Sequence, residues 1–423
     1  MLPESIGRTT IPEFDAAYVA SRSEPEAQIY REEVHSQEPM KSVLESNPEI
    51  YFVQQGRGAD WGKWEFKAGA YYDTTTGSKH PAWQNEALPG ATREIEQLRR
   101  DLVTWGYCVI EDAVTPDKVE VLRDRVIAQA EGERRAGIAF KTMSGQNVHT
   151  CINKGACFAG LIEHTPGTVQ ASAVLEQLMN EALGTGWICT SLIAAISTKG
   201  GAPQALHQDQ AGIHPDSRSP MSVNILTPLT DVDEANGGTL VIPGSHRLLS
   251  DAVREGRPVG KLPPAINIEA KSGAMVLTDG RLLHGTGINY TDTPRIVMLS
   301  NMQKSWLRQQ ENWMLSVAPD VLDAASPTLL QRMGYQATLL AQTNEGHGFG
   351  AAGKVGEAAG ALVGFRRAAD RGDYLRVGVL GPDSSEEELQ APYTVRQVVA
   401  DARAAAWTGP KRSAVSQVQP GKG

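Results

Sequence analysis

A regular pattern of apolar and polar positions begins near residue 91. Ile95, Leu98 and Leu102 recur at spacings of three and four residues, which predicts a helix with one buried face. The short apolar run 107–110 follows and is typical of a strand. The tripeptide Thr-Pro-Asp at 115–117 then supplies an N-cap residue, a first-turn proline and a first-turn acid, so a second helix is expected to begin there.

Between residues 187 and 302 the pattern changes to short β-type runs separated by turn residues. The runs predict strands at 187–197, 221–229, 239–242, 266–269, 274–277 and 295–301. Segments rich in Gly, Pro, Asn and Asp separate them, at 199–203, 234–238, 243–246 and 291–294. Several short strands at regular spacing indicate a sandwich or a barrel. Helical composition returns at about 319–342.

Composition narrows the class of protein. The 423 residues are 41% hydrophobic and 21% charged, and 40 basic against 49 acidic residues give a net charge of −9. This balance argues against binding to nucleic acid or to a membrane surface. Four cysteines without a CxxC pair indicate neither a disulfide framework nor a cysteine zinc site. With no signal peptide and no membrane-spanning run in the sequence, we expect a cytoplasmic protein.

The chain divides into three parts. Residues 1–90 lack an amphipathic period but hold eight of the 25 aromatic residues between positions 51 and 83. We expect this arm to pack on the main domain as a satellite core, with a lid or wall over a substrate pocket as the functional alternative. Residues 91–340 form the predicted core domain. Residues 341–423 form a C-terminal extension whose end, rich in Gly, Pro, Ser and Lys, is expected to be flexible.

Two histidines and one aspartate stand out among the polar residues. His207 and Asp209 are two residues apart on a segment that leaves a β-run, so their side chains point to the same face. An imidazole and a carboxylate are two members of a 2-His-1-carboxylate triad for Fe(II). His284 follows the predicted strand 274–277 and is the candidate third ligand. Arg295, eleven residues later, has the planar fork that pairs with the far carboxylate of a dicarboxylate co-substrate.

The remaining histidines are assigned simpler roles. Four lie in polar, loop-like surroundings and are expected to be surface or capping residues: His35, His80, His164 and His347. His246 is assigned to the Pro-Gly-Ser-His turn, and His214 to a loop that borders the pocket. The stretch 348–354 has the GxxxxGK spacing of a phosphate-binding loop, but Val355 stands where Ser or Thr should bind Mg²⁺. A flexible Gly/Ala-rich loop is the favoured interpretation.

These motifs resemble the phytanoyl-CoA dioxygenase family of Fe(II)- and 2-oxoglutarate-dependent oxygenases. The matching segments are His-Gln-Asp at 207–209, Asn-Gly-Gly-Thr-Leu-Val-Ile-Pro-Gly-Ser-His-Arg at 236–247 and the stretch from His284 to Arg295. The middle segment is the most specific of the three. The strand 107–110 and the following helix also resemble the opening of the family, so the likeness covers roughly residues 91–340.

The resemblance implies a fold, a reaction and a set of site residues. The fold is mainly β with flanking helices (α+β): a double-stranded β-helix, the jelly-roll barrel of cupin-like proteins. His207, Asp209 and His284 would bind Fe(II), and Arg295 would bind 2-oxoglutarate with help from the Thr286 hydroxyl. Three protein ligands leave octahedral positions for 2-oxoglutarate and O₂. The expected activity is hydroxylation or other oxidation of an unactivated C–H bond, with release of succinate and CO₂.

Three alternatives remain open. An iron enzyme of the same fold could catalyse desaturation, epoxidation or ring formation. A non-catalytic barrel could serve as a metal-binding scaffold, and a divalent-metal cupin could act as an isomerase or lyase without any need for Arg295. We expect a small-molecule partner of apolar character, with no nucleic acid or membrane. The polar segment 141–158 could contact that substrate, but an ordinary surface loop is favoured.

Overall fold

The computed structural model describes residues 8–10, 40–47, 63–65, 81–142, 144–199, 204, 206–210, 217–263, 265–335 and 377–390. Most of the predicted aromatic arm lies outside these ranges, and so do His35, His80, His214 and His347. The GxxxxGK stretch at 348–354 and most of the C-terminal extension also lie outside.

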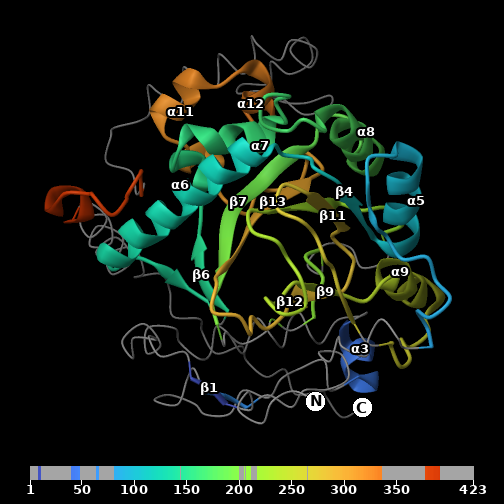
Figure 1. Ribbon diagram of the computed structural model, residues 1–423. Helices are drawn as coiled ribbons and strands as arrows, with labels where there is room; N and C mark the ends of the chain where they lie inside the picture. The colour runs from blue at the N-terminus through green and yellow to red at the C-terminus, as the bar shows by residue number, and fades with distance from the viewer. Residues whose placement is uncertain are drawn as a thin grey trace, which may run out of the picture.

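A large sheet of eight strands forms the centre of the molecule (Figure 1), in the order β3-β4-β11-β8-β13-β7-β6-β5. Its strands are β3 Ala91–Thr92, β4 Tyr107–Ile110, β5 Phe140–Lys141, β6 Gly145–Val148, β7 Ile188–Ser197, β8 Ser222–Pro228, β11 Met275–Asp279 and β13 Arg295–Gln303. All neighbours pair antiparallel except β3 and β4. The last of these eight strands in sequence order, β13, lies between β8 and β7.

A smaller sheet packs against one face of the large one. It consists of β9 Thr239–Val241, β10 Ile266–Asn267 and β12 His284–Thr286, in the order β10-β9-β12. Its Leu240, Val241 and Ile266 share one buried cluster with Leu226 and Val276 of the large sheet. Two antiparallel sheets facing each other across an apolar interior are the double-stranded β-helix, so the predicted fold class is confirmed.

Helices cover the opposite face of the large sheet (Figure 1). They include α5 Ile95–Trp105, α6 Pro116–Arg135, α7 Ala159–Glu163, α8 Ser172–Leu183, α10 Trp313–Ser316, α11 Pro319–Ala324 and α12 Pro327–Arg332. Alternate residues of β7 and β13, among them Ala194, Ile196 and Met298, enter a core formed with these helices. The predicted starts of α5 and α6 and the predicted strand β4 are confirmed. No helix within the described part of the chain combines the length and apolarity that crossing a bilayer requires.

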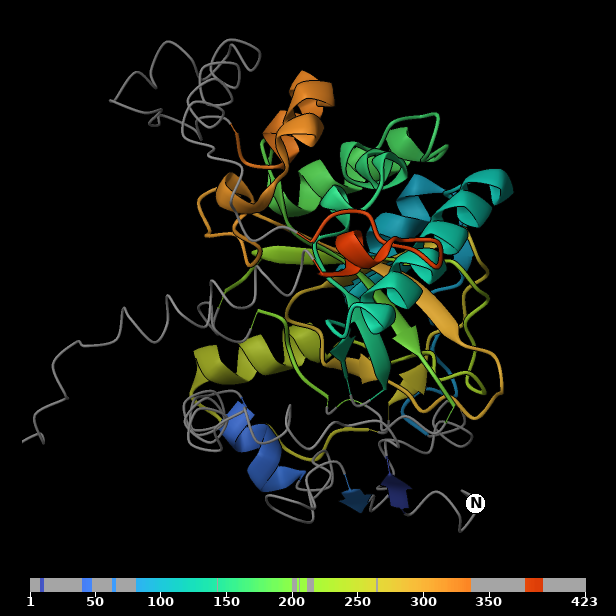
Figure 2. The same ribbon diagram turned by 90° about the vertical axis from the view of Figure 1, so that its left-hand side faces the viewer.

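Two outlying segments contact this framework. Helix α3, Met40–Ser46, reaches the inner core through Val43, and the Asn47 side chain bonds the backbone of residues 260 and 262. Residues 377–390 lie along α6 (Figures 1 and 2), where Leu380 and Leu389 pack on Ala136. A Cβ added to Gly132 of α6 would lie 2.5 Å from Leu380, so this glycine permits the close approach.

Two local predictions are wrong, and a third is correct only in part. His246 belongs to helix α9, Ser245–Glu255, and not to a turn: Gly244 has φ of 77° and serves as N-cap. His164, expected to be a surface or capping residue, is the C-cap of α7 but does not lie at the surface: it is 3% exposed, and its Nδ1 lies 2.8 Å from Glu176. The segment 141–158 is not an ordinary surface loop, because β6 lies within the large sheet and two short 3₁₀-helices, η4 Cys151–Asn153 and η5 Ala156–Phe158, follow it.

Candidate metal centre

His207, Asp209 and His284 converge at the mouth between the two sheets. His207 Nε2 lies 3.2 Å from Asp209 Oδ1, and His284 Nε2 lies 3.3 Å from Asp209 Oδ2. One ligand atom from each side chain lies within 4.8 Å of the others. Two imidazoles and one carboxylate at this separation are a donor set suited to a divalent transition metal such as Fe(II).

The backbone holds the two histidines together. His207 and His284 form an isolated antiparallel bridge, in which the His207 amide donates to the His284 carbonyl at 2.9 Å and the His284 amide donates back at 3.0 Å. The Gln208 side chain donates to the Arg281 carbonyl, and the Gln210 amide donates to the Gly280 carbonyl. The segment that carries His207 and Asp209 is therefore anchored to the chain just before His284.

Neighbouring opposite charges shift the pKa values of Asp209 and His284. Burial opposes the charged form of Asp209, but the positive potential of His284 and the hydrogen bonds from both histidines hold its pKa well below the ordinary value. Burial likewise opposes protonation of His284, and the neighbouring Asp209 charge outweighs it, so the pKa of His284 is raised. The His284 Nδ1 lies 3.0 Å from the Leu282 carbonyl, which directs Nε2 toward Asp209.

Arg295 begins β13, as predicted, and is 4% exposed. Its Nη2 donates to Ser197 Oγ at 3.1 Å, while its Nε has no partner among the described residues. Burial lowers the pKa of this guanidinium to about 10. A buried cation without a carboxylate partner is costly, and an anionic ligand carboxylate would satisfy it.

Thr286 lies at the end of β12, two residues after His284 and therefore on the same side of the strand. Its hydroxyl donates to Gln204 Oε1 at 3.5 Å. It belongs to the same short strand as His284 and is partly exposed. The structure thus brings His207, Asp209 and His284 into contact, and it places Thr286 on β12 of the small sheet and Arg295 on β13 of the large sheet.

Two polar residues beside the candidate metal ligands belong to none of the sequence motifs. Asn224 of β8 donates from Nδ2 to Asp209 Oδ2, and Asn301 of β13 donates from Nδ2 to Asn224 Oδ1. Both asparagines interrupt apolar strand runs, which is the only signal that the sequence offers for them.

One wall of the barrel interior is partly open. Cross-strand partners share a face of a sheet, and the register pairs Arg295 with Ser197, Leu299 with Ile193 and Asn147 with Ala195. The side chains of β6, β7 and β13 that point inward with Arg295 therefore include Asn147, Ala195, Ile193 and Leu299, and all four are partly exposed. Their neighbours on the other face are buried under the helices. The partly exposed side chains of this inward wall are apolar except for Asn147 and Asn301.

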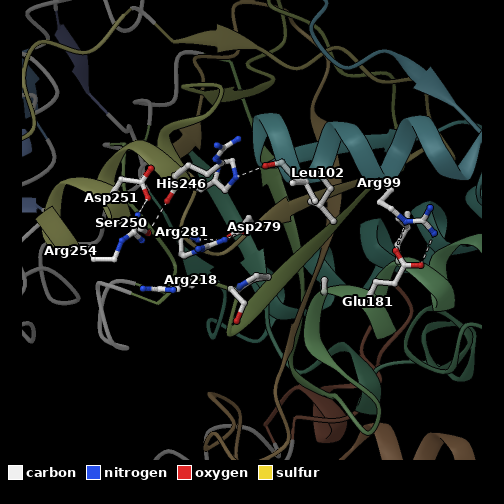
Figure 3. A pocket seen from close by; sticks show the side chains of 16 residues that line it. Arg99, Leu102, Glu181, Arg218, His246, Ser250, Asp251, Arg254, Asp279 and Arg281 are labelled. Carbon is white, nitrogen blue, oxygen red and sulfur yellow. Dashed lines mark hydrogen bonds and ion pairs between the residues drawn. The ribbon is translucent and has the colours of Figure 1, made fainter.

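A separate cavity of about 530 Å³ lies between α5, α8 and α9 (Figure 3). Three ion pairs line it: Arg99–Glu181, Arg254–Asp251 and Arg281–Asp279. None of the three candidate metal ligands lines this cavity. Each of these arginines is already paired with an acidic residue of the chain, so the cavity offers no additional ligand to the candidate metal site.

Comparison with known proteins identifies the family of this arrangement. The family model described as phytanoyl-CoA dioxygenase (PhyH) matches residues 103–297. The dioxygenase af480 of Aspergillus fumigatus is 30% identical over 264 residues, which cover 60% of this chain and 83% of that protein. An iron/alpha-ketoglutarate-dependent dioxygenase, ausU of Aspergillus calidoustus, is 26% identical over 170 residues, covering 38% of this chain and 54% of its own.

Among solved structures, HygX from Streptomyces hygroscopicus with nickel and 2-oxoglutarate bound is 17% identical, with a TM-score of 0.39. The alignment covers 50% of this chain and 88% of HygX.

Proposed function

Because this chain belongs to the phytanoyl-CoA dioxygenase family of Fe(II)- and 2-oxoglutarate-dependent dioxygenases, we propose that it oxidises an unactivated C–H bond of a small natural product or other metabolite. In the proposed reaction O₂ and 2-oxoglutarate are consumed, and succinate and CO₂ are released as the substrate is hydroxylated. The observation that carries the proposal is the convergence of two imidazoles and one carboxylate in a barrel that also holds a buried arginine with no carboxylate partner among the described residues.

His207, Asp209 and His284 are the proposed iron ligands. The low pKa of Asp209 keeps its carboxylate charged, which contributes a negative charge toward a divalent cation. When bound, Fe(II) supplies the redox chemistry that activates O₂ with 2-oxoglutarate as co-substrate. With three ligands from the protein, the metal would still have room to bind these two molecules. The backbone bridge between His207 and His284 holds the two imidazoles in place before a metal arrives.

Arg295 is the proposed partner of the far carboxylate of 2-oxoglutarate. Its guanidinium offers a planar pair of donors for bidentate binding, and Ser197 fixes one end of that fork. Thr286 is the proposed second donor to the same carboxylate. Both residues would orient the co-substrate within the barrel.

The inward wall of β6, β7 and β13 is the proposed substrate surface. Ile193, Ala195 and Leu299 are partly exposed there and would exclude water and pack against apolar parts of a substrate. Asn147 adds one hydrogen-bonding group. This composition supports a substrate that is largely apolar with few polar substituents.

The test is succinate formation by purified protein with Fe(II), 2-oxoglutarate and a library of natural products. Product masses of +16 or −2 distinguish hydroxylation from desaturation or ring closure. His207→Ala, Asp209→Ala and His284→Ala should each abolish turnover without unfolding the chain. Asp251→Asn, which changes an aspartate of the arginine-lined cavity, is the matched control and should retain activity. A triad variant with normal iron binding and normal turnover would disprove the proposed ligand set.

A further inference from the structure

We propose that Asn224 and Asn301 form an amide relay that fixes the orientation of the Asp209 carboxylate, so that Asp209 offers one oxygen atom to the metal. Asn224 holds the other oxygen, and Asn301 acts only through Asn224. Both are positioning residues. The inference rests on the proposed function, because it takes Asp209 as a metal ligand.

The contacts of the relay run in one direction. Asn301 Nδ2 donates to Asn224 Oδ1, and Asn224 Nδ2 donates to Asp209 Oδ2. Asn224 and Asn301 are direct partners in the register of β8 and β13, so their side chains point to the same face of the sheet. Asn224 is 7% exposed. A buried amide of this kind stays in place when its polar ends are satisfied.

The two hydrogen bonds favour the same orientation of the Asn224 amide. A flipped amide would turn Oδ1 toward the Asp209 carboxylate, which repels it, and would turn Nδ2 toward the Nδ2 of Asn301, where two donors meet. Asp209 and Asn301 therefore favour the same orientation of Asn224, with Nδ2 toward Asp209 and Oδ1 toward Asn301. The register of β13 shifts between Asn301 and Met302, and a shift of this type re-aims a side chain relative to a regular strand.

The relay separates the two oxygen atoms of Asp209. Oδ2 accepts the Asn224 hydrogen bond and lies 3.3 Å from His284 Nε2, while Oδ1 lies 3.2 Å from His207 Nε2. A carboxylate can bind a metal through one oxygen or through both, and an amide donor on one oxygen competes with the metal for that atom. Single-oxygen binding leaves a coordination position free, which a bidentate co-substrate needs in addition to the position for O₂.

A matched control exists on the next strand. Thr278 of β11 is the register partner of Asn224 on its other side and is fully buried. Its hydroxyl has no hydrogen-bond partner among the residues that the structure describes. Thr278→Val therefore changes a buried polar group beside Asn224 without removing a contact to Asp209.

The experiment measures the dissociation constant of Mn(II) for the full-length, metal-free protein by competition with a fluorescent chelator, without 2-oxoglutarate. Asn224→Leu should raise this constant about 10- to 100-fold, the usual effect of removing a partner of a metal ligand. Asn301→Leu should raise the dissociation constant less, because Asn224 then keeps its hydrogen bond to Asp209 and loses only the one from Asn301. The double variant should match Asn224→Leu alone, and Thr278→Val should match the unmodified protein. Melting temperatures of the metal-free variants report on folding, and Asn301→Leu, at a partly exposed position, carries the test if Asn224→Leu does not fold.

Several outcomes would overturn the relay. An unchanged constant in Asn224→Leu with a raised KM for 2-oxoglutarate would place Asn224 on the co-substrate instead. Additive effects in the double variant would mean that Asn301 does not act through Asn224. An equal effect of Thr278→Val would mean that the constant depends only on side-chain packing in the wall. Failure of the proposed function is distinguishable, because then the unmodified protein binds no Mn(II), or Asp209→Ala binds it equally well.

Discussion

Replacing Arg295 by methionine should stabilise the metal-free protein and remove its response to 2-oxoglutarate. The guanidinium is 4% exposed and has one hydrogen bond, to Ser197, with no carboxylate partner among the described residues. Burial lowers its pKa to about 10, which at about 1.4 kcal/mol per pKa unit corresponds to a cost of roughly 3 kcal/mol. Because the folded pKa is the lower one, this cost is fully present at neutral pH and declines as the pH rises through 10.

Methionine fills a similar volume without a charge, so the free energy of unfolding should rise by about 1–3 kcal/mol. At roughly 2–4 °C per kcal/mol, the melting temperature should rise by several degrees. 2-Oxoglutarate at 100 times its dissociation constant should stabilise the unmodified, metal-loaded protein by about 2.7 kcal/mol and the methionine variant by much less. Arg295→Lys keeps the charge but loses the fork, and the KM for 2-oxoglutarate should rise about 10- to 200-fold, on the order of 1.4–3 kcal/mol.

Calorimetry or thermal-shift measurements with and without 2-oxoglutarate check both halves of this reasoning. Ser197→Ala is a useful control, since it removes the hydrogen bond and leaves the buried cation. A methionine variant that is less stable than the unmodified protein and still gains stability from 2-oxoglutarate would refute the assignment of Arg295.

Three further predictions concern other parts of the molecule. Thr286→Ala should raise the KM for 2-oxoglutarate less than Arg295→Lys does, in steady-state assays at saturating substrate. Ala195→Phe should fill the inward wall, so that substrate oxidation falls at least tenfold while slow, substrate-independent succinate release persists in the same assay. Gly132→Ala should displace the segment 377–390 from α6, because a Cβ there lies 2.5 Å from Leu380. Limited proteolysis should then cleave this segment faster. Gly260→Ala is the control, because Gly260 has open space around it.

Local signals in the sequence were sufficient for much of the fold. The spacing of Ile95, Leu98 and Leu102 predicted α5, and the run 107–110 matches β4 residue for residue. Each of the six strands predicted after residue 187 overlaps an observed strand to within a few residues. In these cases the hydrophobic period and the turn residues carry the information within one short window.

The errors arise where a short window holds conflicting signals. The glycine and serine before His246 are turn residues in composition, but Gly244 is the N-cap of α9 and the helix begins one residue later. The polar stretch around Asn147 resembles a loop in composition, but it forms the strand β6. Alternate residues of β6 are partly exposed, because the barrel interior beside them is open. In both places tertiary packing selects the conformation.

The candidate site was predictable as far as it depends on motifs. The proximity of His207, Asp209 and His284 follows from the order of their segments. The contact of Asn224 with Asn301, 77 residues apart, depends on the register of two strands and on a local shift at Asn301. A single sequence contains no measure of that register, so the relay could only be found in the structure.

The central position of β13 has a consequence for how the protein is made. This strand is the last of the eight to leave the ribosome, yet it fills the gap between β8 and β7. Until residue 303 has emerged, two strand edges in the middle of the sheet lack their neighbour and are open to pairing with other chains. Arg295 arrives with the strand that closes them. Synthesis thus completes the sheet and delivers Arg295, the proposed co-substrate residue, in one event, and chains that stop before residue 295 should be substrates for chaperones and proteases.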